Sequence, residues 1–121
     1  LDAAETLANL DLLVVTELVL TDTARLADVI LPAACFAEKT GTFTNTEGRV
    51  QAITETVPSP GISRTDWEIL VDLSQYLDKP LKYSMPQHIW EDITRSVDSY
   101  RGMTLTDVAG IGTRSVSLQP A

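Results

Sequence analysis

The sequence contains very few of the side chains that bind metals or form cross-links. Cys35 and His88 are the single cysteine and the single histidine among its 121 residues. A disulfide needs two cysteines, and structural zinc sites and iron–sulfur clusters each use about four Cys or His ligands. This chain alone therefore builds none of the three. We expect Cys35 to be a small buried apolar side chain and His88 to lie on the surface or at the cap of a helix.

Positive charge is also scarce. The 9 Lys and Arg residues are outnumbered by 17 Asp and Glu, which gives a formal net charge of −8 at pH 7. Nucleic acids and anionic membranes bind basic patches, so neither is an expected partner, although one local positive pocket for a phosphate remains compatible with this balance. No apolar run approaches the roughly 20 residues of a membrane span, so we expect no membrane insertion.

The two ends of the sequence lack the features expected of natural chain termini. The chain begins at Leu1 instead of methionine and stops at Ala121 after a stretch without a clear terminal element. We interpret it as a segment of a longer protein. It shows no signal peptide, which favours the cytoplasm, and an export signal upstream of Leu1 would change that expectation.

The first third of the chain predicts a compact β-α-β unit. A helix over residues 2–10, capped by Asp2, precedes the apolar run 12–15, which has the character of a strand buried on both faces. A short helix capped by Thr21 or Asp22 follows, and then a second apolar strand, 29–31, ends at Pro32. About a dozen residues separate the two strands, which is near the minimum for a right-handed parallel crossover.

The rest of the chain predicts helices and one further strand. Residues 49–53 have the pattern of a short strand, and the polar stretch before them is expected to be a loop. Thr65 and Glu68 form a capping box that opens a helix to about Leu77, with an inward face made by Trp67, Leu70, Leu73 and Leu77. Ser84 opens a second helix, with Ile89, Trp90, Ile93 and Val97 toward the core. The class is α/β: we expect a partial Rossmann-like domain with parallel strands and flanking helices over residues 1–100, and an irregular tail over 101–121.

Two charged side chains stand where ligands bind in open α/β sheets, at or near the carboxyl ends of the strands, and a third lies at the start of a helix. Glu17 ends the first strand, and its carboxylate is either a ribose acceptor or a solvated strand end. Lys39 precedes Gly41 on the polar stretch, and it is either a clamp for a phosphate or ribose oxygen or a surface lysine. Asp66 lies in the first turn of a helix, where the helix dipole favours an acid in any case; its two oxygens also suit adjacent donors such as those of a guanine edge. The chain has no Walker loop, nucleophile elbow, GxGxxG or metal constellation.

Several stretches together resemble one protein family. They are "TDTARLADVILP", "FAEKTGTFTNTEGRVQ", the run Arg64-Thr65-Asp66-Trp67 and "YSMPQHIWEDI". They resemble the molybdopterin oxidoreductases, in particular the large subunit of molybdenum- or tungsten-dependent formate dehydrogenases. The resemblance covers about residues 3–105, and the block "ADVILP…EKTGTFTNTEGR" is its most specific part.

This resemblance implies a cofactor-binding role. It suggests that the segment holds one guanine dinucleotide arm of a bis-molybdopterin guanine dinucleotide cofactor that carries Mo or W. The family's contacts fall on Thr16, Glu17, Lys39 and Asp66, although the family often has Ser and Asp at the first two positions. Residues 33–51 would form a loop that wraps the nucleotide end. No catalytic residue and no metal ligand is expected in this segment, because the family's metal ligand and iron–sulfur cysteines lie upstream.

Three functions remain as hypotheses. The leading one is a piece of a formate dehydrogenase, whose parent oxidises formate to carbon dioxide with the rest of the subunit and electron-transfer subunits as partners. The second is the related large iron–sulfur subunit of NADH–quinone oxidoreductase, in which the segment is structural and no molybdenum is present. The third is a stand-alone α/β binding domain without a cofactor. The stretch "YSMPQHIWEDI" favours the first.

Overall fold

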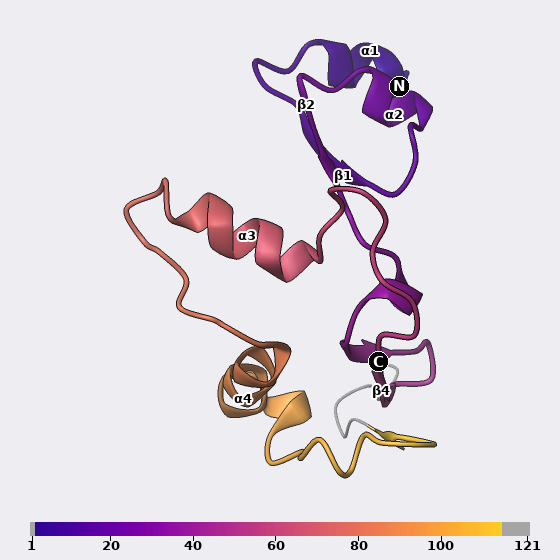
Figure 1. Ribbon diagram of the computed structural model, residues 1–121, viewed down its shortest axis with the longest axis vertical. Helices are drawn as coiled ribbons and strands as arrows, with labels where there is room; N and C mark the ends of the chain where they lie inside the picture. Colours follow the sequence, from indigo (N-terminus) through magenta and orange to yellow (C-terminus); the bar gives the residue numbers. More distant parts are fainter. Residues whose placement is uncertain (1, 115–121) are drawn as a thin grey trace.

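The structure is a computed structural model that describes residues 2–114, and it confirms the α/β class (Figure 1). Its elements in chain order are α1 (Ala3–Ala8), β1 (Val14–Glu17), α2 (Asp22–Arg25), β2 (Val29–Pro32), the 3-10 turn η1 (Phe36–Glu38), β3 (Gly41–Thr44), β4 (Arg49–Ile53), α3 (Asp66–Ser74), α4 (Pro86–Ser96), the 3-10 turn η2 (Asp98–Tyr100) and β5 (Thr113–Arg114). No helix among the described residues is long and apolar enough to cross a membrane.

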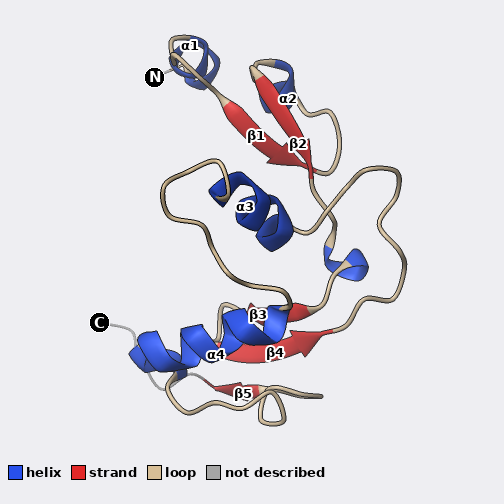
Figure 2. Cartoon of the chain, turned by 60° about the vertical axis from the view of Figure 1, so that its left-hand side comes forward, coloured by secondary structure: helices blue, strands red, loops and turns tan. Residues whose placement is uncertain are grey.

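These elements form an elongated molecule with a separate sheet near each end. Figure 1 shows β1, β2, α1 and α2 at one end, α3 in the middle, and α4 with the second sheet at the other end. The first sheet is the parallel pair β1-β2, and the second is the antiparallel sheet β3-β4-β5. In Figure 2, α4 lies along β3 and β4.

The predicted parallel pair is present. Val14 is opposite Val29 and Glu17 is opposite Pro32, so the carboxyl ends of β1 and β2 meet at one edge. The connecting helix α2 is capped by Thr21, whose side-chain oxygen accepts the Ala24 N–H at 3.2 Å. The expected burial on both faces is wrong, because Val14, Val29 and Ile30 are exposed. A parallel sheet is buried only when helices cover both faces, and α2 is a single turn that covers little of this pair.

The polar stretch predicted as a loop is largely a β-hairpin. β3 pairs with β4 from Gly41 opposite Ile53 to Thr44 opposite Val50. In the turn between them, the Asn45 carboxamide oxygen accepts two backbone N–H groups at 2.9 Å, and Gly48 has a left-handed φ of 73°. The threonines that gave the stretch its loop-like composition are β-branched, and β-branched residues fit a pleated surface. Only residues 33–40 keep an irregular path, which includes η1.

A small core joins α4 to the antiparallel sheet. Val50 from β4, Trp90 from α4 and Val108 are buried together, and the Trp90 and Tyr100 rings make an edge-to-face contact at 6.0 Å. The segment after Tyr100 consists mostly of turns, as expected, yet it contributes Val108 to the core and β5 to the edge of β4. The Ala52 N–H donates to the Val108 carbonyl at 2.8 Å, which fastens this segment to the sheet. The domain boundary at residue 100 stays a prediction, and residues 115–121 lie outside the described part.

The start of α3 was predicted correctly and its packing was not. Thr65 is the N-cap, and its backbone N–H donates to the Glu68 carboxylate at 3.1 Å, as a capping box requires. The helix ends at Ser74, not at Leu77. Trp67 is half-buried, whereas Leu70, Leu73 and Leu77 are exposed instead of facing a core. Among residues 2–114, no other helix or strand makes an extensive contact with α3.

The second long helix, α4, differs from its prediction in two details. Its N-cap is Met85, with Pro86 at the first helical position, so Ser84 lies one residue outside. Trp90 is buried as expected, whereas Val97 follows the helix and is exposed.

Candidate functional site

A cavity of about 530 Å³ lies where the chain passes from the parallel pair to the antiparallel sheet. Its volume falls within the ~300–1,000 Å³ usual for small-molecule sites. The lining comes from segments that are far apart in sequence: Thr16, Glu17, Leu18, Ala33, Ala34, Cys35, Phe36, Lys39, Phe43, Ile53 and Asp66. All four residues predicted to contact a ligand, Thr16, Glu17, Lys39 and Asp66, line this one cavity.

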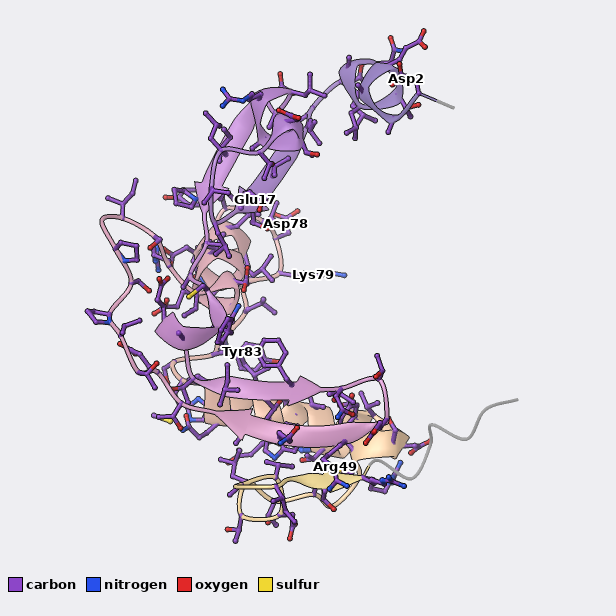
Figure 3. The ribbon with its side chains drawn as sticks, turned by 90° about the vertical axis from the view of Figure 1, so that its right-hand side faces the viewer. Asp2, Glu17, Arg49, Asp78, Lys79 and Tyr83 are labelled. Carbon is purple, nitrogen blue, oxygen red and sulfur yellow. The ribbon has the colours of Figure 1, made fainter. Side chains whose placement is uncertain are left out.

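The carboxyl ends of the two parallel strands form one wall of the cavity. Thr16 and Glu17 are the last residues of β1, and Figure 3 shows Glu17 at the end of the strand that faces the rest of the chain. The Ala33 N–H donates to the Glu17 carbonyl at 3.0 Å, so the chain leaving β2 stays beside the end of β1. The Glu17 side chain therefore stands at the sheet edge where ligands of open α/β sheets bind.

A backbone hydrogen bond brings the start of α3 to the same edge. Ala33 and Ala34 are buried, and the Ala34 N–H donates to the Arg64 carbonyl at 2.8 Å. Because both alanines have small side chains, the segment that precedes α3 approaches the strand end closely. Asp66, two residues after Arg64, is thereby held at the cavity wall.

Lys39 and Asp66 are joined by an ion pair across the cavity lining. The Lys39 Nζ donates to Asp66 Oδ2 at 2.7 Å, although the two residues are 27 positions apart. The Lys39 side chain is 23% exposed and the Asp66 side chain 49%, so the ammonium is partly withdrawn while the carboxylate remains open to a ligand. Charge-assisted hydrogen bonds of this length are the stronger kind.

The helix start carries a second carboxylate. Asp66 is the first residue of α3 and Glu68 follows in the same turn. Both lie where the helix dipole favours negative charge. Behind them, the Arg64 guanidinium bonds Asp72, and this hydrogen bond raises the pKa of Arg64. Arg64 thus bonds Ala34 through its backbone carbonyl, while its guanidinium charge is paired with Asp72.

The apolar part of the lining was missed by sequence reasoning. Phe36, Phe43 and Ile53 line the cavity together with the charged residues. A signal was available, because Phe36 and Phe43 flank Lys39 at short distance in "FAEKTGTF". Apolar walls with a few convergent polar groups are typical of small-molecule sites.

Cys35 and His88 differ in their relation to the site. Cys35 is half-buried and lines the cavity, so it is less enclosed than predicted. His88 lies on α4 away from the lining, with its Nδ1 3.4 Å from the Ser84 hydroxyl. Within residues 2–114 there is no group of three or more His, Cys, Asp or Glu side chains with the geometry to hold a metal ion.

Comparison with known proteins places this chain in a family. The model of the molybdopterin oxidoreductase family matches residues 2–76, which include every residue of the cavity lining. The chain is 50% identical over 101 residues to the F420-dependent formate dehydrogenase subunit alpha of Methanocaldococcus jannaschii, covering 81% of this chain and 15% of that protein. It is 43% identical over 100 residues to the F420-dependent formate dehydrogenase 2 subunit alpha of Methanococcus maripaludis, with the same coverage of both chains.

The chain is also similar in sequence to a subunit of a different oxidoreductase. The chain is 39% identical over 107 residues to a subunit of an NADH-quinone oxidoreductase of Rhizobium meliloti, covering 88% of this chain and 12% of that protein. The chain therefore spans about 15% of the length of the formate dehydrogenase subunits that it matches. From the match over residues 2–76 and these identities, the chain belongs to the molybdopterin oxidoreductase family.

Proposed function

We propose that this chain is a segment of a formate dehydrogenase alpha subunit, and that its cavity holds the guanine nucleotide end of the molybdopterin cofactor. The observation that carries the proposal is the convergence of Thr16, Glu17, Lys39 and Asp66 on one cavity. The parent would oxidise formate to carbon dioxide in the cytoplasm, together with the rest of its subunit and electron-transfer subunits. The bound cofactor, with Mo or W, supplies the redox chemistry, and an iron–sulfur cluster elsewhere in the parent carries the electrons.

The donor and acceptor set of the cavity fits a nucleoside. Asp66 Oδ2 is held by Lys39, and the carboxylate is half exposed, so it can accept the N–H groups of a guanine edge. Glu17 and Thr16 offer oxygens to ribose hydroxyls at the strand end. Phe36 and Phe43 supply apolar surface for the flat base. The task of these residues is to bind and orient the cofactor.

The second candidate is a subunit of NADH–quinone oxidoreductase, which the likeness to the Rhizobium meliloti protein favours. In that case the same fold serves as structure without molybdenum. Metal analysis of the purified full-length parent separates the two candidates: molybdenum or tungsten together with guanine nucleotide supports formate dehydrogenase, and the absence of both supports the alternative.

Replacing Asp66 tests the proposed contact. In the full-length parent, Asp66→Ala removes a charged hydrogen-bond acceptor, and hydrogen bonds to charged groups contribute about 1.5–3 kcal/mol. We expect guanine nucleotide to be held at least about tenfold more weakly. Nucleotide released on denaturation is quantified by chromatography, and metal by mass spectrometry.

Asp78→Ala is the matched control, because Asp78 is an exposed acid beyond α3 and outside the cavity (Figure 3). It should leave the nucleotide and metal content unchanged. If Asp66→Ala also leaves both unchanged, Asp66 is only an acid that stabilises the start of α3.

The isolated chain is expected to be inactive. The resemblance places the metal ligand and the iron–sulfur cysteines upstream, so the 121-residue chain should not oxidise formate with an artificial electron acceptor. The measurement is the reduction of a viologen dye with formate as donor. Measurable turnover by the pure chain would contradict its assignment as a cofactor-holding segment.

A further inference from the structure

We propose that the chain has a second small-molecule site, which takes an uncharged ligand with a flat apolar body and a hydrogen-bonding oxygen. The site is a cavity of about 370 Å³, here called the α4 cavity, between α4, the hairpin β3-β4 and the first turn of α3 (Figure 2). Its volume falls toward the lower end of the ~300–1,000 Å³ usual for small-molecule sites. The inference is independent of the proposed function, because it concerns another cavity and another ligand.

The α4 cavity is distinct from the cavity beside β1. Successive side chains of a strand point to opposite faces, and on β3 Thr42 lines the α4 cavity while Phe43 lines the other. At the start of α3, Trp67 lines the α4 cavity while Asp66 lines the other. Within residues 2–114, Ile53 is the one residue common to both linings, so a ligand of the α4 cavity would not occupy the proposed nucleotide position.

The walls of the α4 cavity are largely apolar and partly aromatic. Trp67 comes from α3, Ile89 and Trp90 come from α4, and Ala52 comes from β4. Trp67 and Ile89 are half-buried, so each keeps part of its apolar surface accessible. Indole rings make favourable stacked or edge-to-face contacts with other aromatic rings. A flat apolar ligand would therefore remove apolar surface from water at this position.

The charge of the lining excludes some ligand classes. No charged side chain lines the α4 cavity, whose whole lining lies within the described part of the chain. An ion that leaves water for such a site loses hydration without gaining a partner charge, which is costly. The α4 cavity therefore favours an uncharged ligand over a carboxylate or an amine. The cavity beside β1 differs, because Glu17, Lys39 and Asp66 line it.

A few polar groups of the lining are available to an oxygen of the ligand. The side chains of Thr42, Thr54 and Gln87 form no hydrogen bond within residues 2–114. Thr54 and Gln87 are exposed, whereas Thr42 is half-buried. The ring N–H of the buried Trp90 is enclosed and has no acceptor among the same residues. An enclosed donor without an acceptor is unfavourable, so a ligand oxygen that reaches this N–H would add to the affinity.

The test measures the binding of coumarin to the full-length parent by isothermal titration calorimetry. Coumarin is a flat bicyclic molecule with a carbonyl oxygen and no charge. We expect saturable binding with a dissociation constant below about 1 mM, which is within reach of a ligand of this size. Coumarin carboxylate has the same ring system with a negative charge, and we expect it to bind at least about tenfold more weakly.

Thr42→Phe shows whether the probe binds in the α4 cavity. The substitution fills part of the cavity and removes a free hydroxyl, so it should weaken coumarin binding by at least about tenfold. Thr46→Phe is the matched control, because it makes the same substitution at an exposed position of the hairpin turn, outside the cavity. It should leave the dissociation constant within about twofold of the wild-type value.

A second variant keeps the test decisive if Thr42→Phe does not fold. Gln87 lies in the first turn of α4 and is exposed, so its replacement disturbs little packing. Gln87→Phe places a ring beside the open side of the cavity, and we expect it to weaken coumarin binding by at least about threefold.

Three results would overturn the inference. Failure of the wild-type parent to bind coumarin would mean that the cavity is closed or is filled by other parts of the parent. Unchanged binding by Thr42→Phe, or by Gln87→Phe where the first variant does not fold, would place the probe elsewhere. Equal affinity for coumarin and its carboxylate would contradict an uncharged ligand. None of these results bears on the guanine nucleotide content that tests the proposed function.

Discussion

One ammonium group balances one of the two carboxylates that line the cavity, which leaves the charged part of the lining with a net negative charge. Lys39 and Asp66 come from an irregular segment and a helix start that are joined only through the fold. Asp66 is held in place by the Ala34–Arg64 backbone bond and by the capping box at Thr65. The proposed recognition of a base therefore depends on a few hydrogen bonds that orient one side chain.

A second aspartate gives a prediction about acid stability. The Asp107 carboxylate accepts the N–H and the hydroxyl of Thr104 at 2.8 and 2.7 Å, and these bonds lower the pKa of Asp107 below its ordinary 3.8. A folded-state pKa below the unfolded one stabilises the fold above pH 3.8, and this contribution disappears as pH falls through the lower folded-state pKa. Asp107→Asn should therefore flatten the pH dependence of the unfolding free energy below about pH 4.

Chemical denaturation at a series of pH values from about 2 to 6 measures this dependence, since the Asp reference pKa near 3.9 lies inside that range. Asp78→Asn is the control, because Asp78 is exposed and its carboxylate forms no hydrogen bond within residues 2–114. Identical pH profiles for Asp107→Asn and the wild type would show that the Thr104 bonds contribute nothing to stability.

The charged residues of the site were predictable, and its walls were not. Glu17, Lys39 and Asp66 stand beside strand ends and a capping box, which are local signals. That they share one cavity follows from the parallel pairing of β1 and β2 and from the bond between Ala34 and Arg64, which no local pattern encodes. Phe36 and Phe43 flank Lys39 in the sequence, but they were overlooked because an aromatic residue in a polar stretch has no period to indicate its side.

The strand β4 of the hairpin meets β5 beside a glycine that tolerates no side chain. Gly112 has a φ of 71°, and a Cβ built there would lie 2.1 Å from the Val50 carbonyl oxygen. Gly112→Ala should therefore destabilise the fold by more than the roughly 1–3 kcal/mol of a left-handed non-glycine residue. The free energy of unfolding from denaturant titration measures the effect.

Gly110→Ala is a matched control for this prediction. Gly110 also has a left-handed φ, 60°, yet a Cβ there meets nothing within 4 Å. Gly110→Ala should therefore lower the free energy of unfolding only by the cost of a non-glycine residue with a left-handed φ. Equal destabilisation by both substitutions would mean that β5 moves away from β4 without cost.

For the helices and strands, the starts of α2 and α3 and the parallel pair β1-β2 were predicted better than the packing of side chains. Capping residues determined where α2 and α3 begin, because a cap is a local hydrogen bond. The hairpin was missed because threonine and glycine are common in both turns and strands, and only the long-range register distinguishes them. The sequence correctly predicted an apolar face on α3. The spacing of apolar residues does not reveal whether an element that covers this face lies within the same 121 residues.

Over the whole molecule, apolar surface is left uncovered. On α3 and just beyond it, Leu70, Leu73, Tyr76 and Leu77 are exposed, with Tyr76 at 88%. Apolar patches on this scale usually mark a contact surface. We expect the isolated chain to associate, and Leu73→Glu to reduce the association by placing a charge in the patch. Sedimentation velocity at rising protein concentration measures it.

Thr46→Glu, at an exposed position in the hairpin turn, introduces the same charge far from α3 and is the control. It should associate like the wild type. A wild-type chain that sediments as a monomer at all concentrations would contradict the expectation, and equal reduction by both variants would point to net charge instead of the patch.

The cavity lies at the junction of three parts of an elongated molecule. Its lining takes Thr16 and Glu17 from one sheet, Phe43 and Ile53 from the other, and Asp66 from the helix between them. Apart from the cavity lining, the two sheets are joined mainly by irregular chain (Figure 2). In the proposed function, a nucleoside seated there would supply contacts that the two sheets do not make with each other, so binding of the cofactor would stabilise their relative placement.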